Sequence, residues 1–269
     1  MKNGPGRLKY FENNWPTNKG AWFPGEAVRY REKSLFDDFS DSGWMTLFLY
    51  GINGKFPTEN QAKMIEKIWL ISSSFPDPRL WNNRISSLAA TSRSTGSLAI
   101  SASVAVTEAK IYGTRPVLLG SSFLVELEKI ASNDEDIERY IISRLKKERN
   151  LPGFGRPIIS KDERIGPLLK EANNLGFGDG RFINLVFQIK EILAMHRYKL
   201  KPNIAIFCSA LFLDLGFSPR QCYLLAVLAF CAGMVPCYID AMEKSEGCFF
   251  PLACKNIEYD GHKKRGLRS

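Results

Sequence analysis

Apolar residues recur at helical spacing through most of the chain, beginning after a lead-in of about fifty residues. Thr58 is placed to cap a helix that ends near Phe75-Pro76. The apolar face of this helix contains Met64, Ile65, Ile68, Trp69 and Ser72. Further helices are predicted over residues 96–112, 123–131, 134–147, 165–174, 182–195, 204–215 and 219–242. Alternating runs of β-branched residues, which would predict strands, are scarce.

Helices joined by short polar links predict an all-α fold with a large helical domain and a small helical subdomain. Residues 1–132 and 198–269 form the predicted large domain. Residues 133–197, which are bounded by charged turns, form the predicted small subdomain. The lead-in is rich in turn formers such as Trp15-Pro16, and it predicts an extended segment with short elements.

The composition describes a chain that can bury a substantial core, since 45% of its 269 residues are hydrophobic and 24% are charged. The net charge of +9 favours an anionic partner, which charge alone does not identify. Nucleic acid is a minor alternative, because the chain contains no familiar motif for binding it. The basic cluster of His262-Lys-Lys-Arg265 and Arg268 is interpreted as a solvated end.

The cysteines indicate a reducing compartment. All six lie in the last quarter of the chain, among apolar neighbours and without a C-x-x-C pair, which predicts buried reduced thiols. The polar start predicts no signal peptide, so we expect a cytoplasmic protein. Residues 223–239 are uncharged, but Gly233 and Pro236 favour a core helix over a membrane span. No Cys/His spacing or acidic cluster predicts a metal site.

The segment Leu151-Pro-Gly-Phe-Gly-Arg-Pro-Ile158, followed by Asp162-Glu-Arg164, carries the strongest functional pattern. Its two glycines let the backbone come close to a ligand, and its prolines stiffen both shoulders. Arg156 and Arg164 add two permanent positive charges that match carboxylate or phosphate oxygens. The alternative is an ordinary Gly-Pro turn with solvated arginines.

Several motifs occur in a fixed order along the chain. They are Trp44–Gly51, Phe56–Ala62, Pro152–Gly155 with Asp162–Arg164, Lys201–Ile204, Leu211–Phe217 and Tyr259–Gly261. This ordered set resembles the citrate synthase superfamily, closest to its short citryl-CoA lyase and citrate-lyase-like branch. The resemblance runs from about residue 28 to the tail. It implies a citrate synthase-like fold, a coenzyme A thioester as substrate and a homodimer.

The resemblance also implies a carboxylate base and two histidines, and the chain departs at each position. The base position holds Ala205, which accepts no proton, and the loop histidine is replaced by Arg156. The second histidine falls near Leu119. Of the arginines that bind a dicarboxylate in the family, one aligns with Phe230, and Arg164 is the plausible survivor.

The predicted site therefore combines retained and replaced residues. The predicted substrate- or CoA-binding residues are Gly153, Phe154, Gly155, Arg164 and Asn203. Arg156 is predicted to stabilise an enolate or oxyanion, and Glu163 is the replacement candidate for the base. His196, at the end of a predicted helix, and His262, in the basic tail, are interpreted as non-catalytic. Ser121 and Ser122 are interpreted in the same way, since no triad context surrounds them.

Two hypotheses of function stay open at this point. In the first, the protein acts on an acyl-CoA thioester as an acyltransferase or carbon-carbon lyase, with altered chemistry that excludes ordinary citrate synthesis. In the second, it is a catalytically inactive citrate synthase-fold scaffold for binding or dimerisation. The expected partners are a small-molecule acyl-CoA or other anionic ligand and a second copy of the chain, with no nucleic acid and no membrane.

Overall fold

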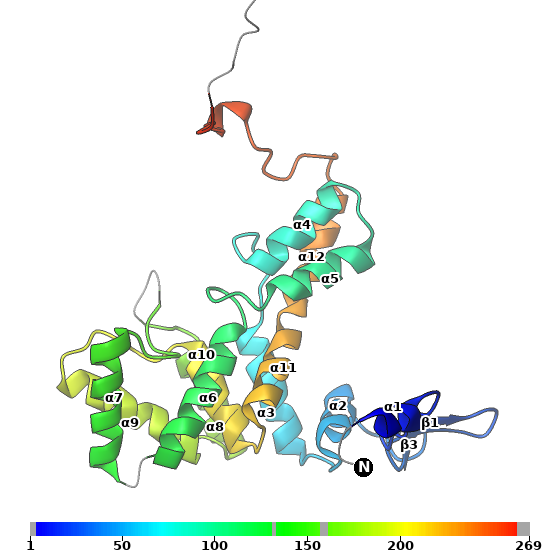
Figure 1. Ribbon diagram of the computed structural model, residues 1–269, viewed down its shortest axis with the longest axis horizontal. Coiled ribbons are helices and arrows are strands. Elements are labelled where there is room, and N and C mark those ends of the chain that lie inside the picture. The colour runs from blue at the N-terminus through cyan, green and yellow to red at the C-terminus, as the bar shows by residue number, and fades with distance from the viewer. Residues whose placement is uncertain (1–3, 131–132, 157–160, 263–269) are drawn as a thin grey trace, which may run out of the picture. The chain divides into compact units, whose positions relative to one another are not determined.

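A computed structural model describes residues 4–130, 133–156 and 161–262 and shows a predominantly helical protein with a small sheet (Figure 1). The predicted all-α class is confirmed. The main helices are α1 (Pro5–Phe11), α2 (Trp44–Asn53), α3 (Glu59–Ser72), α4 (Trp81–Thr91), α5 (Gly96–Val106), α6 (Arg115–Ile130), α7 (Asp134–Glu148), α8 (Ile165–Leu175), α9 (Arg181–Met195), α10 (Ile204–Asp214), α11 (Pro219–Ala229) and α12 (Cys231–Met242). The strands are β1 (Gly20–Phe23), β2 (Ala27–Tyr30) and β3 (Lys33–Ser34), and a short 3-10 helix spans Cys254–Asn256.

The chain packs into two compact units. Unit 1 contains Met1–Ile68 and Gly166–Asp179, and unit 2 contains Trp69–Ile165 and Gly180–Ser269. The predicted subdomain over residues 133–197 stays a prediction. The basic tail after His262 lies outside the described residues.

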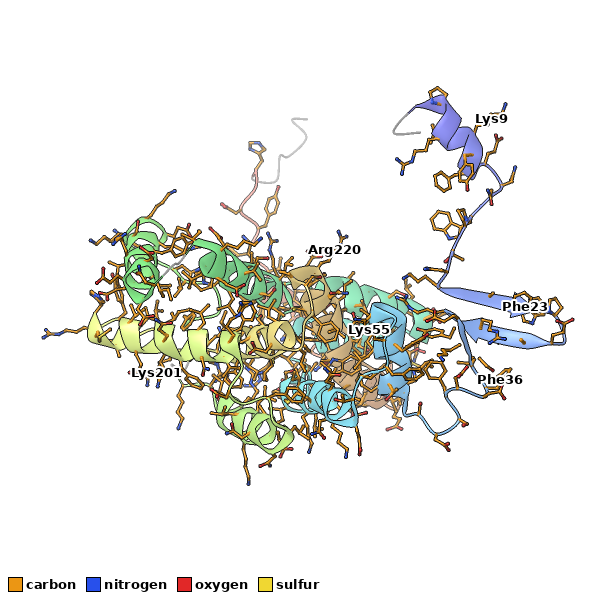
Figure 2. The ribbon with its side chains drawn as sticks, turned by 90° about the horizontal axis from the view of Figure 1, so that it is seen from below. Lys9, Phe23, Phe36, Lys55, Lys201 and Arg220 are labelled. Carbon is orange, nitrogen blue, oxygen red and sulfur yellow. The ribbon has the colours of Figure 1, made fainter. Side chains whose placement is uncertain are left out.

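Unit 1 joins an antiparallel sheet, in the order β1-β2-β3, to the C-terminal end of α2. The guanidinium of Arg31 donates hydrogen bonds to the carbonyl of Gly51 at 3.2 and 3.0 Å and to that of Ile52 at 3.1 Å. These carbonyls belong to the last turn of the helix, where backbone carbonyls have no hydrogen-bond donor within the helix. Figure 2 shows Phe23 toward the far end of the β1–β2 hairpin, where its side chain is exposed.

Unit 2 is built around α10. All eight residues from 206 to 213 are buried, and α10 packs against α6 and α9 (Figure 1). A helix that is apolar on every face can be stable only when neighbouring elements cover it completely. The sequence Ile204-Ala-Ile-Phe-Cys-Ser-Ala-Leu-Phe-Leu-Asp214 therefore accounts for its central place.

Helix α4 was not among the predicted helices because its buried face is polar. The described buried residues of this face include Asn82, Ser86 and Ser87. Ser86 Oγ donates to the carbonyl of Met234 at 2.6 Å, and Asn82 Nδ2 donates to that of Phe230 at 3.1 Å. Buried polar side chains need hydrogen-bond partners, and here the backbone of a neighbouring helix provides them. Such a face is buried without forming an apolar stripe in the sequence.

Several predicted boundaries were wrong. The helix predicted over 96–112 ends at Val106, and the one predicted to begin at 123 already begins at Arg115. The single helix predicted over 219–242 is divided at Phe230. The prediction for the cysteines was also wrong in part, because Cys248 and Cys254 are exposed and Cys231 is half-buried, while the other three are buried.

Within the described residues, Pro219–Met242 is the one helical stretch long and apolar enough to cross a membrane by length and composition. One such stretch is weak evidence for a span, because a core helix passes the same test. Its halves contribute buried residues to unit 2, among them Leu225 in α11 and Met234 in α12.

Candidate functional site

The glycine loop pairs with the segment that leads into α10. The amide of Gly155 donates to the carbonyl of Lys201 at 2.7 Å, and the amide of Asn203 donates to that of Gly153 at 2.9 Å. Between them, Phe154 and Pro202 form an isolated antiparallel bridge. The predicted loop is thus held at the N-terminus of the most buried helix of the unit.

Gly153 is required by packing against α10. Its φ of +79° lies in the left-handed region, where a side chain is strained. A Cβ at this position would lie 2.3 Å from the Cβ of Ile206. Gly153 and Phe154, which is buried, do not line the cleft described below, so their place in the structure is explained by packing. Their predicted contact with substrate stays a prediction.

The N-terminus of α10 is satisfied by two side chains. Asn203 is the N-cap, and its Oδ1 accepts hydrogen bonds from the amides of Ala205 and Ile206 at 3.0 and 3.3 Å. Its Nδ2 donates to the carbonyl of Gly155 at 3.0 Å. The carboxylate of Asp162 accepts from the amide of Ile204 at 2.8 Å. Because these groups occupy the free amides, this helix end has little capacity left to bind a further anion.

Asp162 is a buried carboxylate with a full set of partners. Its side chain has an exposed fraction of 0%, and Arg164 donates two hydrogen bonds of 2.9 Å to its two oxygens. Burial by itself would raise the pKa of the Asp162 carboxyl. The hydrogen bonds and charge of Arg164, together with the Ile204 amide, outweigh burial, and the pKa is lowered. Asp162 is therefore ionised near neutral pH.

Arg156 and Glu163 form an ion pair with each other. Arg156 Nη1 lies 2.6 Å from Glu163 Oε2, and Arg156 also donates to the carbonyl of Lys161 at 3.0 Å. The hydrogen bond from Arg156 lowers the pKa of Glu163. A carboxylate with a lowered pKa is a weaker base, so this contact makes Glu163 less suited to removing a proton. The roles predicted for both residues stay predictions.

A cleft of about 250 Å³ opens beside this loop in unit 2. Of the residues predicted from sequence, Gly155, Arg156, Arg164 and Asn203 line it, whereas Glu163 does not. The other lining residues are Ser72, Ser73, Ser74, Phe75, Leu80, Lys110, Ile111, Tyr112, Gly113, Pro116, Val117, Asp162, Ile204, Ala205, Cys208, Phe212, Ala226 and Phe230.

Lys110 and Tyr112 at the rim of the cleft were not recognised in the sequence. Both belong to the turn between α5 and α6, in a stretch that the sequence pattern assigned to a helix. Lys110 is exposed and, among the described residues, has no carboxylate within 4.0 Å. No motif marked these residues, because their place at the cleft depends on where α5 ends.

The positions at which the chain departs from the family pattern fall in two places. Ala205 and Phe230 line the cleft, whereas Leu119 is 47% exposed and lies outside the lining.

His196 caps the C-terminus of α9, with its Nε2 2.6 Å from Glu138 Oε1. Ser121 donates to the carbonyl of Val117 within its own helix. Among the described residues, no group of three His, Cys, Asp or Glu side chains is arranged to hold a metal.

The sequence model of the family described as "Citrate synthase, C-terminal domain" matches residues 25–247. This chain belongs to the citrate synthase family. The match includes the glycine loop, the segment leading into α10 and the whole described lining of the cleft. No curated protein matches the chain.

Solved structures show the same citrate synthase-like fold. Citryl-CoA lyase from Hydrogenobacter thermophilus is similar over 94% of this chain and 97% of its own, with a TM-score of 0.83 and 18% identity. ATP citrate lyase from Methanothrix soehngenii, solved with citrate and coenzyme A, has a TM-score of 0.78 and 17% identity. This chain is covered completely in that comparison but spans only 46% of the lyase. Citrate synthase from Thermotoga maritima has a TM-score of 0.65 and 17% identity, over 85% of this chain and 60% of that one.

Proposed function

We propose that this protein binds an acyl-CoA thioester in the cleft of unit 2 and acts on it by chemistry other than ordinary citrate synthesis. The observation that carries the proposal is the lining of the cleft. It contains Gly155 of the glycine loop and three basic side chains, Lys110, Arg156 and Arg164, but offers no carboxylate free to take a proton among the described residues.

Binding of an anionic carrier is supported by the charges at the cleft. Three cations, Lys110, Arg156 and Arg164, are countered by the two carboxylates of Asp162 and Glu163. Lys110 is the cation without a described partner, and it is positioned to attract a phosphate or carboxylate. The solved ATP citrate lyase holds citrate and coenzyme A, which supports a thioester as the ligand here.

Altered chemistry is supported by the state of the two acidic groups. Asp162 is enclosed between Arg164 and α10, and Glu163 is paired with Arg156. Both have lowered pKa values, so neither matches the pKa near the working pH that favours a general base. In this proposal Arg156 stabilises negative charge on the bound thioester.

A catalytically inactive scaffold that dimerises is the second candidate. It is favoured by the exposed apolar residues of α5 and α12, namely Leu98, Val235 and Ile239, with exposed fractions of 60, 48 and 50%. A second copy of the chain is the proposed partner for these residues, as the family resemblance also implies. A cytoplasmic location is part of either proposal.

Isothermal titration calorimetry with CoA and acetyl-CoA tests binding, and mass spectrometry of mixtures with candidate oxo-acids tests turnover. We expect measurable binding and no citrate or citryl-CoA turnover at ordinary rates, because losing a general base costs roughly 10²- to 10⁴-fold. Absence of CoA binding would refute the proposed ligand. Binding without any turnover of an acyl-CoA would favour the scaffold.

Arg156→Ala is expected to weaken CoA binding by about tenfold, because it removes one charge-assisted contact. The protein should stay folded, since Arg156 lies at the edge of the loop with its side chain 24% exposed. Glu163→Gln is the matched variant, and it should tighten binding severalfold by freeing Arg156 from its ion pair. Titration calorimetry measures both affinities and thermal denaturation checks folding. A loss of stability with unchanged affinity in Arg156→Ala would show that Arg156 is structural.

A further inference from the structure

The buried side chains of the cleft are either apolar or already hydrogen-bonded to other groups of the protein. Its buried lining residues are Ser74, Val117, Asp162, Cys208, Phe212 and Ala226. The two polar members already have partners, since Ser74 donates to Asn83 Oδ1 at 3.0 Å and Asp162 is bound to Arg164. Burial raises the pKa of the Cys208 thiol to about 12, so this group stays neutral. The floor therefore offers contact mainly to uncharged atoms.

The rim of the cleft carries positive charge beside two exposed apolar side chains, Phe75 and Ile111. Lys110 and Tyr112 are exposed there, and the guanidinium of Arg156 is partly exposed on the loop side. An occupant of such a cleft carries its negative charge at the rim and its apolar portion at the floor. The volume of about 250 Å³ is smaller than the roughly 300–1,000 Å³ of sites for drug-sized ligands. It suits the acyl end of a thioester and leaves the bulk of the carrier outside.

Two lining positions strengthen this interpretation. Ala205 and Phe230 stand where the family resemblance places a carboxylate and an arginine that binds a dicarboxylate. Each replacement removes a charge from the cleft and adds an apolar surface. A carboxylate at the acyl end would find no cation at these two positions, and Arg164 in the lining is already bound to Asp162. Such a carboxylate would therefore lose its hydration without a free partner.

We propose, on the basis of the CoA-thioester binding proposed above, that this cleft selects a short uncharged acyl group over a dicarboxylic one. Butyryl-CoA and succinyl-CoA form a matched pair, because both acyl chains have four carbons and differ in the terminal carboxylate. Burial of its two additional methylene groups should make butyryl-CoA bind on the order of tenfold more tightly than acetyl-CoA. It should also bind at least tenfold more tightly than succinyl-CoA, since an unpaired carboxylate is costly to bury.

The experiment is titration calorimetry of the full chain with free CoA, acetyl-CoA, butyryl-CoA and succinyl-CoA. Phe230→Arg should bring the butyryl-to-succinyl affinity ratio down by tenfold or more, because it returns a cation to the lining. Leu224→Arg is the control. It adds the same charge to α11 at a residue that is 53% exposed and lies outside the lining, so the ratio should not change.

The possible failures are distinguishable. If none of the CoA species binds, the proposed function fails and the acyl preference fails with it. If all species bind equally, or succinyl-CoA binds best, the acyl preference alone is overturned and CoA binding stands. Thermal denaturation of both variants shows whether they fold. If Phe230→Arg does not fold, the affinities of the unmodified chain for the matched pair still decide the matter.

Discussion

Replacing Asp162 by alanine is expected to lower the free energy of unfolding by about 3–5 kcal/mol, the cost of breaking a buried ion pair by removing one partner. The carboxylate is fully buried, receives two hydrogen bonds from Arg164 and accepts another from the amide of Ile204 at the start of α10. Its loss leaves a partly buried guanidinium and a helix N-terminus without a counter-charge. Urea denaturation followed by circular dichroism measures the change.

The pH dependence of this effect follows from the direction of the pKa shift. The pKa of Asp162 is lower in the folded protein than in the unfolded chain, where the pKa of an aspartate is about 3.9. The stabilisation by the ionised group is therefore fully present above that pH and is lost as the pH falls through the folded pKa. The difference between the wild type and Asp162→Asn should be constant near neutrality and should shrink below about pH 4.

Asp77→Ala is a matched control, because Asp77 and Arg79 have the same spacing in sequence as Asp162 and Arg164. Arg79 is 82% exposed, so solvent screens this second pair. We expect Asp77→Ala to have a much smaller effect than Asp162→Ala. Equal effects of the two substitutions would contradict the role assigned to burial and to the amide of Ile204.

Gly153→Ala is expected to cost about 2–5 kcal/mol, because it combines left-handed backbone strain with overpacking. The added Cβ would lie 2.3 Å from Ile206 Cβ, and the branch point of Ile206 cannot rotate away. The strain should displace the loop from α10 and with it the pairing of Gly155 with Lys201. Chemical denaturation measures the loss of stability, and titration with CoA measures the consequence for binding.

Gly216→Ala separates the two contributions. Gly216 has a comparable φ of +87°, but a Cβ there would meet no atom within 4 Å. Its substitution should therefore cost only the backbone strain, about 1–2 kcal/mol. If Gly153→Ala is no more damaging than Gly216→Ala, the close approach of the loop to α10 does not constrain this position.

Much of the fold follows from local patterns in the sequence. The helix predicted over residues 204–215 is observed as α10, and Thr58 caps α3 as predicted, its Oγ1 accepting from the amide of Gln61 at 3.1 Å. The glycine loop and the ordered motifs led to the citrate synthase family, which the family match confirms. Helix periodicity and capping are properties of neighbouring residues, and so they can be recognised without knowing the tertiary structure.

Other features were decided only by the tertiary structure. The polar buried face of α4 depends on carbonyl groups of α12, about 150 residues away in the chain, so hydrophobic periodicity does not mark it. The pairing of Arg156 with Glu163, and of Asp162 with the amide of Ile204, sets which charges are available to a ligand.

The amino-acid sequence by itself determined the helical class, the family and the residues of the loop. Only the tertiary structure decided that Lys110 and Tyr112 join the loop at one cleft and that Glu163 does not. The physical reason is that a side chain's partners and pKa depend on groups brought close by long-range packing, whereas helix formation depends mainly on residues within a few positions of one another.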